Sequence, residues 1–501
     1  MTPRLAGWRL AGLGGALGVL AGFGQAPYDQ PLILMAALVG AVYVYRSAET
    51  GRQAALFGWA LGTGYFAHAL QWIVSPFLVD VARHGWMAPF AVAFLSAGLA
   101  LFWGAAFWAA RRLDAHRAWP LILCLSSAEL VRAYVFTGFP WAMPSQALVD
   151  KLGGQALAWI GPYALNAVMI AIAVALGFAA RTGPQRVMQY GVILFGLGAF
   201  VLPPMVPEAA MTDHTVRLVQ PNAAQRDKWD PDKIPDFFDR QLQFTTALPE
   251  DGSKVPDLVL WSETAIPWQL DYAGTALVEI ATAGANATVA LGLQRSAAER
   301  FYNSMVVLDQ DGTVAQVYDK HHLVPFGEYV PFAEALNRLG IFGLAQRIPA
   351  GYSSGVGAKL LDFGPLGRAL PLICYEAVFP HHVNAAPERP NFLIQITNDA
   401  WFGKGAGPRQ HLAQARMRAI EQGLPLARSA NTGISAMIDP YGRILASLPL
   451  NTAGFVDAAL PRPLPPTVYS RTGDMSFAVL LLLGFGFAFI RIRRHSAGFN
   501  D

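Results

Sequence analysis

Three residues with complementary chemistry each follow a short apolar run of the sequence. Cys374 comes after LPLI, Glu263 after LVLWS, and Lys320 after VAQVYD. A cysteine attacks an acyl group as its thiolate, and a partly buried carboxylate of raised pKa accepts the thiol proton. A fixed ammonium beside the reacting carbonyl stabilises the negative charge that develops there. Such a Cys–Glu–Lys set needs no metal and no organic cofactor, and we expect neither.

Each of these residues also has an ordinary structural explanation. A cysteine in an apolar run is most often a small buried side chain, a glutamate after a strand commonly caps or pairs, and a lysine beside histidines is commonly solvated. The chain has only two cysteines, and Cys124 lies within a long apolar segment. We therefore expect Cys374 to be a free thiol, which is a liability in an oxidising compartment unless it is used.

A pair of histidines, His321 and His322, follows Lys320 directly and raises the question of a metal site. Adjacent residues of a strand point to opposite faces, so we expect the two rings to diverge. We predict no metal site at this pair.

The elements that must position these residues lie between about 212 and 470, where the composition is that of an ordinary globular domain. Apolar strands that alternate with helices indicate α/β layering with covered sheets, and hairpins add antiparallel pairs. In open α/β sheets, polar residues at the carboxyl ends of strands assemble the site. The predicted strands are 215–222, 257–263, 287–294, 303–309, 312–320, 370–376, 391–399, 434–442 and 443–450, and the predicted helices are 230–247, 272–284 and 408–423.

We expect lipid, and not water, to surround much of the rest of the chain. Hydrophobic residues make up 53% of the 501 and charged ones only 14%, against about 25% charged in soluble domains; the mean hydropathy is +0.33. Since about 20 apolar residues span a bilayer as a helix, we predict eight spans. They lie near 6–24, 30–45, 54–75, 87–110, 118–137, 156–180, 187–204 and 474–490.

Arginine placement orients these spans. Arginines gather at the N-terminus and after the second, fourth, sixth and eighth spans, while the intervening loops carry few. By the positive-inside rule, both termini are cytoplasmic. The predicted organisation is seven spans in 1–205, a periplasmic domain in 212–470, an eighth span in 474–492 and a cytoplasmic tail in 493–501 of a multi-pass bacterial inner-membrane protein. A net charge of +3 without a basic patch excludes nucleic acid as a partner.

Four stretches resemble the nitrilase superfamily of carbon–nitrogen hydrolases and acyltransferases. They are WSETAIPW (261–268), YDKHHLVPFGEYVPF (318–332), LICYEAVFP (372–380) and QITNDAWFG (395–403). The resemblance implies an αββα sandwich, so that the expected fold is a membrane α-helical bundle of about eight spans plus an α/β nitrilase-like domain. It implies that Glu263 is the general base, Lys320 the oxyanion stabiliser and Cys374 the nucleophile.

The same resemblance implies further residues around this set. It places Glu328, Tyr375 and Glu376 in support of the catalytic residues, and it suggests that Trp229 and Asn303 contact substrate. Two aromatic residues in AWFGKGAGPRQ are substrate-contact candidates on composition alone, with packing as an equal alternative: Trp401 and Phe402. The Gly-rich apolar stretch 336–355 suggests a lid.

With the apolar bundle, the pattern resembles the membrane-bound acyltransferases of that superfamily. This implies transfer of the sn-1 acyl chain of a phospholipid, through a Cys374 thioester, to the α-amino group of an apolipoprotein's diacylglyceryl-cysteine. The expected partners are the phospholipid donor, the apolipoprotein acceptor and membrane lipid, and the expected state is a monomer. Two alternatives stay open: a tethered periplasmic amidase or nitrilase acting on small amides, and a non-enzymatic lipid transport or binding protein.

Overall fold

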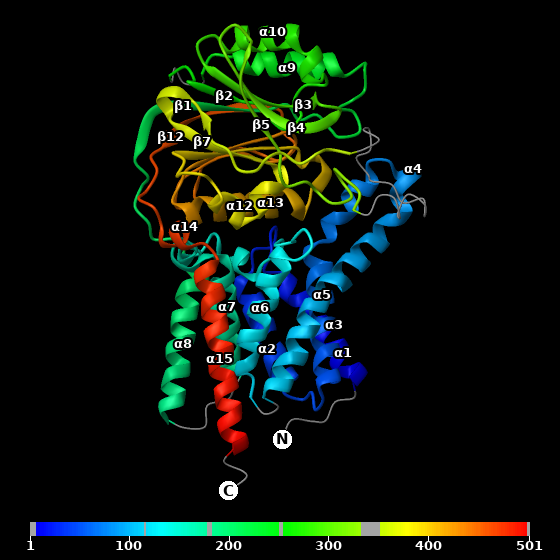
Figure 1. The fold of residues 1–501 in the computed structure, drawn as a ribbon, viewed down its shortest axis with the longest axis vertical. Helices are drawn as coiled ribbons and strands as arrows, with labels where there is room; N and C mark the ends of the chain where they lie inside the picture. The colour runs from blue at the N-terminus through cyan, green and yellow to red at the C-terminus, as the bar shows by residue number, and fades with distance from the viewer. Residues whose placement is uncertain (1–6, 115–116, 178–182, 250–253, 332–350, 498–501) are drawn as a thin grey trace. The chain divides into compact units, whose positions relative to one another are not determined.

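The computed structural model describes residues 7–114, 117–177, 183–249, 254–331 and 351–497, which form two compact units (Figure 1). One unit, here the helical unit, contains Met1–Val74, Trp86–Val206 and Thr467–Asp501. The other, here the sheet unit, contains Ser75–Gly85 and Pro207–Pro466. The sheet unit therefore includes a short segment from the first half of the chain.

The helical unit has a helix at each of the eight predicted apolar segments. Within the described residues, two helical stretches are long and apolar enough to cross a membrane, Val81–Leu113 and Leu152–Gly177, and three shorter ones are apolar, Pro31–Tyr45, Tyr190–Val201 and Met475–Arg491. The eight helices are α1 (Gly7–Gly22), α2 (Pro31–Tyr45), α3 (Gly51–Ala69), α5 (Ala88–Leu113), α6 (Trp119–Tyr134), α7 (Leu157–Gly177), α8 (Gly183–Val201) and α15 (Met475–Ala497). The short helix α14 (Val468–Thr472) precedes α15 in this unit, whereas α4 (Val81–His84), which precedes α5, belongs to the sheet unit.

Glycines let α1 and α3 approach closely. A Cβ on Gly18 would lie 2.0 Å from the carbonyl oxygen of Leu61, and one on Gly64 would lie 2.2 Å from that of Gly15. Small residues at helix contacts are typical of membrane helices, where backbones pack directly. The glycine content of the first segment therefore serves helix packing.

A buried ion pair in α6 fixes the chain that follows this helix. Arg132 Nη2 lies 2.7 Å from Glu129 Oε2, and Trp103 Nε1 donates to Glu129 Oε1 at 2.8 Å. Arg132 also donates to the carbonyls of Phe139 and Trp141. The two buried charges of the pair thus compensate each other, and the remaining donors of Arg132 bond two backbone carbonyls, as a buried charge requires.

The sheet unit is a sandwich of two six-stranded sheets within the described residues. The first sheet has the order β12-β1-β2-β3-β4-β5 and the second β11-β10-β9-β8-β7-β6. The strands of the first are β1 (Met211–Gln220), β2 (Leu258–Leu260), β3 (Thr288–Ala297), β4 (Arg300–Leu308), β5 (Val314–Asp319) and β12 (Gly454–Pro461). Those of the second are β6 (Leu361–Asp362), β7 (Arg368–Ile373), β8 (Phe392–Thr397), β9 (Leu426–Ala430), β10 (Ser435–Ile438) and β11 (Ile444–Leu448).

Helices cover both outer faces of the sandwich (Figure 1). The helices α9 (Ile234–Thr246) and α10 (Gly274–Gly284) pack on the first sheet through a core that includes Trp261 and Ile280. On the second sheet, α13 (Ala406–Gln422) packs through a core that includes Leu372 and Leu412, and α12 (Pro380–Asn384) lies on the same side. This is the predicted αββα sandwich.

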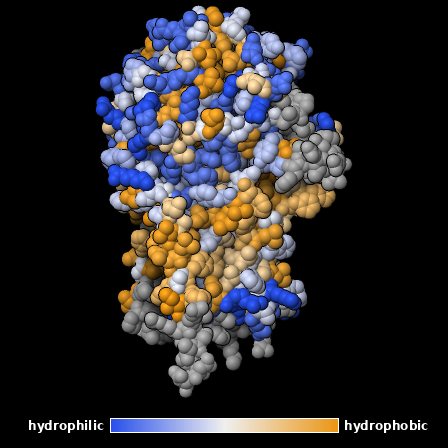
Figure 2. Space-filling model, in the orientation of Figure 1, coloured by the Kyte–Doolittle hydropathy of each residue, from blue (hydrophilic) through white to orange (hydrophobic). Residues whose placement is uncertain are grey.

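Strands β1, β2 and β3 are parallel, as are β7, β8 and β9, while the outer pairs are antiparallel. The predicted strands and helices match these elements, with ends that differ by a few residues in either direction. Three strands were not predicted: β6, β9 and β12. Figure 2 shows a largely hydrophobic visible face on the helical unit and a largely hydrophilic one on the sheet unit.

Candidate active site

The predicted base and lysine lie together beyond the ends of two strands of the first sheet. Glu263 follows β2 and Lys320 follows β5 directly, and Lys320 Nζ lies 3.7 Å from Glu263 Oε1. The same ammonium lies 2.8 Å from Glu328 Oε2. All three side chains are largely buried. One ammonium thus lies between two carboxylates.

Neighbouring amides hold the Glu263 carboxylate on both oxygens. Asn303 Nδ2 donates to Glu263 Oε1 at 2.7 Å and to Glu328 Oε1 at 3.1 Å. The backbone N–H of Asn398, the residue after β8, donates to Glu263 Oε2 at 2.7 Å. Asn303 is therefore part of the cluster, bridging its two carboxylates; its predicted contact with substrate stays a prediction.

The backbone around Glu263 is fixed by a glycine in β3. Gly292 donates to the carbonyl of Ser262 at 3.2 Å and accepts from the N–H of Ala265 at 2.7 Å. A Cβ on Gly292 would lie 2.7 Å from Glu263 Cα. No larger residue fits there without moving the glutamate.

Cys374 stands where β7 turns into a short 3₁₀ helix, η8 (Cys374–Val378), in the second sheet. Its φ is 53°, a left-handed conformation that costs energy in a residue with a Cβ. The thiol is free and buried. Burial, and then the Glu263 carboxylate, raises the pKa of Cys374 well above its ordinary value, while Lys320 opposes this rise. The resting side chain is therefore a protonated thiol near both predicted partners.

The charge of Lys320 is secured by its neighbours. Burial alone would lower the pKa of this ammonium, but Glu328, Glu263 and Cys374 together raise it above its ordinary value. Lys320 therefore stays a cation across the physiological pH range, as an oxyanion stabiliser must.

The predicted supporting residues Tyr375 and Glu376 are buried in η8. Glu376 Oε2 accepts from the N–H of Ile373 at 2.7 Å, and its Oε1 accepts from the N–H of His321 at 2.8 Å and from Tyr318 Oη at 2.9 Å. Burial opposes ionisation, yet His321 and these backbone donors keep the pKa of Glu376 below its ordinary value. Glu376 ties the loop after Lys320 to the loop of the nucleophile.

The expectation that His321 and His322 diverge is wrong. His321 Nε2 lies 3.3 Å from His382 Nδ1, and His382 Nε2 lies 2.9 Å from His322 Nδ1. Because β5 ends at Asp319, both histidines belong to a loop, in which strand alternation does not apply. Among the described residues, no group of three or more His, Cys, Asp or Glu has the geometry to hold a metal ion.

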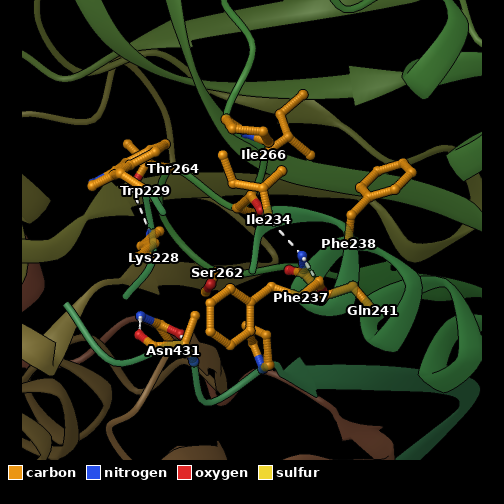
Figure 3. A pocket seen from close by; sticks show the side chains of 14 residues that line it. Lys228, Trp229, Ile234, Phe237, Phe238, Gln241, Ser262, Thr264, Ile266 and Asn431 are labelled. Carbon is orange, nitrogen blue, oxygen red and sulfur yellow. Dashed lines mark hydrogen bonds between the residues drawn. The ribbon is translucent and has the colours of Figure 1, made fainter. Parts of the chain in front are cut away.

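Trp229 lines a small pocket beside the base, with a cavity of about 20 Å³, room for roughly one water molecule. Figure 3 shows Trp229 and Lys228 on one side of it and Phe238 and Gln241 on the other. Lys228 Nζ donates to the carbonyl of Glu263 at 3.1 Å and to Thr264 Oγ1 at 2.9 Å. Burial lowers the pKa of Lys228 to about 8, against the attraction of Glu263.

The two aromatic candidates after β8 differ in exposure. Phe402 is buried, with its ring 5.4 Å from that of His411, which supports the packing alternative for this residue. Trp401 is half-buried, and its contact with substrate stays a prediction. Most of the predicted lid, residues 336–350, lies outside the described residues.

A fully buried polar network that was not predicted from the sequence lies behind Cys374. Asp399 accepts from Thr397 Oγ1 at 2.8 Å, from His411 Nδ1 at 2.9 Å and from Arg428 Nη2 at 2.6 Å. His411 Nε2 in turn lies 3.0 Å from the carbonyl oxygen of Cys374. The signal was present in QITND, where polar residues follow an apolar run just as Glu263, Lys320 and Cys374 do.

Comparison with known proteins agrees with this geometry. Residues 235–464, which lie within the sheet unit, match the family model of carbon–nitrogen hydrolases. Residues 17–175 match the apolipoprotein N-acyltransferase N-terminal domain.

Relatives extend the match to nearly the whole chain. The apolipoprotein N-acyltransferase of Rhodopseudomonas palustris is 35% identical over 97% of this chain and 96% of its own. Those of Bradyrhizobium diazoefficiens and Brucella suis are 36% and 37% identical over 98% and 96% of this chain, and over 96% and 94% of their own. The chain belongs to the apolipoprotein N-acyltransferase family of enzymes.

Proposed function

We propose that this chain transfers an acyl chain from the sn-1 ester of a phospholipid to the α-amino group of the diacylglyceryl-cysteine of an apolipoprotein. The observation that carries the proposal is the placement of Lys320 between Glu263 and Glu328, beside the buried thiol of Cys374. A thiol, a base and a fixed cation are the parts that acyl transfer through a covalent intermediate requires.

In the first half-reaction, Glu263 accepts the proton of the Cys374 thiol, and the thiolate attacks the ester carbonyl. Lys320 stabilises the oxyanion that forms. The proton on Glu263 then goes to the departing lysophospholipid oxygen, leaving a thioester on Cys374. Asn303 and the N–H of Asn398 hold the carboxylate of Glu263 in place throughout.

In the second half-reaction, the amine of the acceptor attacks the thioester and gives a proton to Glu263. The amide forms, and the sulfur leaves and regains its proton. The near-complete burial of Lys320 and Cys374 supports transfer to an amine over transfer to water, because a dry site protects a thioester from hydrolysis.

We also propose that the eight helices of the helical unit span the bacterial inner membrane, with both termini in the cytoplasm and residues 212–470 as the periplasmic catalytic domain of a monomer. Large apolar side chains exposed along these helices support this, among them Phe94 in α5, Leu194 in α8 and Leu482 in α15. Soluble proteins rarely expose large contiguous apolar surfaces.

The test separates transfer from hydrolysis. Detergent-solubilised protein is incubated with a phospholipid that carries a labelled sn-1 chain, and label on Cys374 is assayed for sensitivity to hydroxylamine. We expect labelled wild-type protein and unlabelled Cys374→Ala, and discharge of the label to a diacylglyceryl-cysteine peptide. Absence of label in the wild type, or equal label in Cys374→Ala, contradicts the mechanism. Discharge only to water supports the small-amide hydrolase alternative.

A further inference from the structure

The buried network behind the nucleophile contacts Cys374 at two different atoms. The backbone carbonyl oxygen of Cys374 lies 3.0 Å from His411 Nε2 and accepts a hydrogen bond from Gln395 Nε2 at 3.2 Å. The side chain of Thr397, the last residue of β8, lies within hydrogen-bond reach of the Cys374 sulfur and acts to lower the pKa of the thiol. Because β7 and β8 are parallel and pair as far as Ile373 and Ile396, Thr397 is the next residue alongside Cys374.

The hydroxyl of Thr397 has one hydrogen and two possible acceptors. In the resting structure this hydrogen is donated to Asp399 Oδ1 at 2.8 Å, and the oxygen is left to face a protonated thiol. A hydroxyl rotates freely about its C–O bond to suit its partners. When the thiol loses its proton, the sulfur becomes an anion that attracts this hydrogen.

Asp399 tolerates the loss of that donor because other donors remain. Its Oδ1 also faces His411 Nδ1 at 2.9 Å, and its Oδ2 accepts from Arg428 Nη2 at 2.6 Å. A carboxylate buried among apolar groups would be costly without partners. Here release of the threonine hydrogen leaves each carboxylate oxygen with a donor.

We propose that Thr397 is a further catalytic residue, whose hydroxyl hydrogen turns from Asp399 to the sulfur of Cys374 when the thiolate forms. His411 is then a positioning residue, which keeps Asp399 satisfied through Nδ1, while Gln395 donates to the carbonyl of the nucleophile. No covalent bond is made or broken in this step; the hydroxyl only rotates. The inference rests on the proposed role of Cys374 as nucleophile in acyl transfer.

The test measures the thiolate directly, without phospholipid or acceptor. In full-length solubilised protein carrying Cys124→Ala, Cys374 is the only thiol, and its alkylation by iodoacetamide is followed as a function of pH. A hydrogen bond to an anion contributes enough to change the thiolate population roughly 10-fold. We expect Thr397→Val to slow alkylation roughly 10-fold at neutral pH and to move the profile to higher pH.

Thr397→Ser, which keeps the hydroxyl, is expected to restore the rate to within about twofold. Thr246→Val, an exposed threonine of α9 whose hydroxyl bonds only within its helix, is the matched control and leaves the profile unchanged. Thr397→Ala replaces the valine variant if valine impairs folding. The proposal is overturned if Thr397→Val or Thr397→Ala has the alkylation profile of the wild type. It is also overturned if Thr397→Ser is alkylated as slowly as Thr397→Val.

The outcome is independent of the function assigned above. A shifted alkylation profile with no thioester from phospholipid would retain the role of Thr397 and reject the acyl donor. A thioester formed from phospholipid together with an unshifted alkylation profile would support the acyl donor and reject the role of Thr397.

Discussion

At Cys374, one residue combines a strained backbone, a buried thiol and contacts from several elements. Its partners in the first sheet were predictable, because Glu263 and Lys320 follow apolar runs and have side chains of obvious use. Thr397, Asp399 and His411 were not predicted: the first two also follow an apolar run, but a threonine, aspartate or histidine alone has many ordinary explanations. What identifies them is contact across elements, which the order of residues in the chain does not reveal.

Glu376 allows a test at the same scale. In Glu376→Gln, the side-chain NH₂ replaces one carboxylate oxygen, so the N–H or O–H groups that donated to that oxygen lose their acceptor. We expect the free energy of unfolding to fall by about 1–3 kcal/mol. Glu279→Gln, on the exposed side of α10, is the control. Thermal unfolding of the two variants checks this; equal melting temperatures would show that the buried carboxylate contributes nothing.

The pH dependence of stability follows from the same carboxylate. Its pKa in the folded protein is lower than the ordinary 4.5 of an unfolded chain. Ionised Glu376 therefore stabilises the fold fully above about pH 4.5, and this contribution is lost as the pH falls through the folded pKa. The melting temperature of the wild type should thus fall more steeply on acidification than that of Glu376→Gln; parallel curves would contradict this.

At the scale of elements, sequence pattern succeeded where a strand is apolar and failed where it is not. The unpredicted β9 reads LARSA, and its Arg428 is buried only because Asp399 and Gln395 receive its guanidinium. The unpredicted β12 is half-exposed along most of its length. Neither strand has the continuous apolar run by which a strand is predicted from sequence. Both form nonetheless, because residues distant in the chain satisfy their polar side chains.

The contact between β3 and the Glu263 loop gives a prediction for one element acting on another. Gly292→Ala places a Cβ against Glu263 Cα and displaces the base. A shift of about 1 Å in a catalytic group lowers turnover roughly 100-fold. Labelling from phospholipid should therefore slow by about that factor, while iodoacetamide still reaches Cys374.

Gly274→Ala is the matched glycine control, because no heavy atom lies within 4 Å of its added Cβ. We expect wild-type labelling from this variant. Equal rates for Gly292→Ala and Gly274→Ala would show that the close approach of β3 does not set the position of Glu263.

For the whole molecule, composition alone predicted an apolar part and a globular part, and the structure has a helical unit and a sheet unit. The composition did not reveal that Ser75–Gly85 belongs with the sheet unit. Apart from Ser75, the last residue of the predicted span 54–75, this segment lies between predicted spans, and nothing in its residues relates it to the loop after Phe402, about three hundred positions away. In the structure a Cβ on Gly403 would lie 2.3 Å from Ser75 Oγ.

Membrane topology is the prediction that belongs to this scale. A reporter that is active only outside the cytoplasm should be active when fused after residue 210 and inactive when fused after residue 48, because the arginines near 46 and 52 are retained inside. Activity at both positions, or at neither, would contradict the proposed orientation.

The pairing of β1 with β12 has a consequence for biosynthesis. Arg217 of β1 and Asp457 of β12 form a buried ion pair across 240 positions of sequence. During synthesis of the chain, β1 is made well before its neighbour β12. For that interval it presents an unpaired edge, which is a template for joining other chains. A stop codon before residue 454 would therefore leave this edge of β1 without its partner strand.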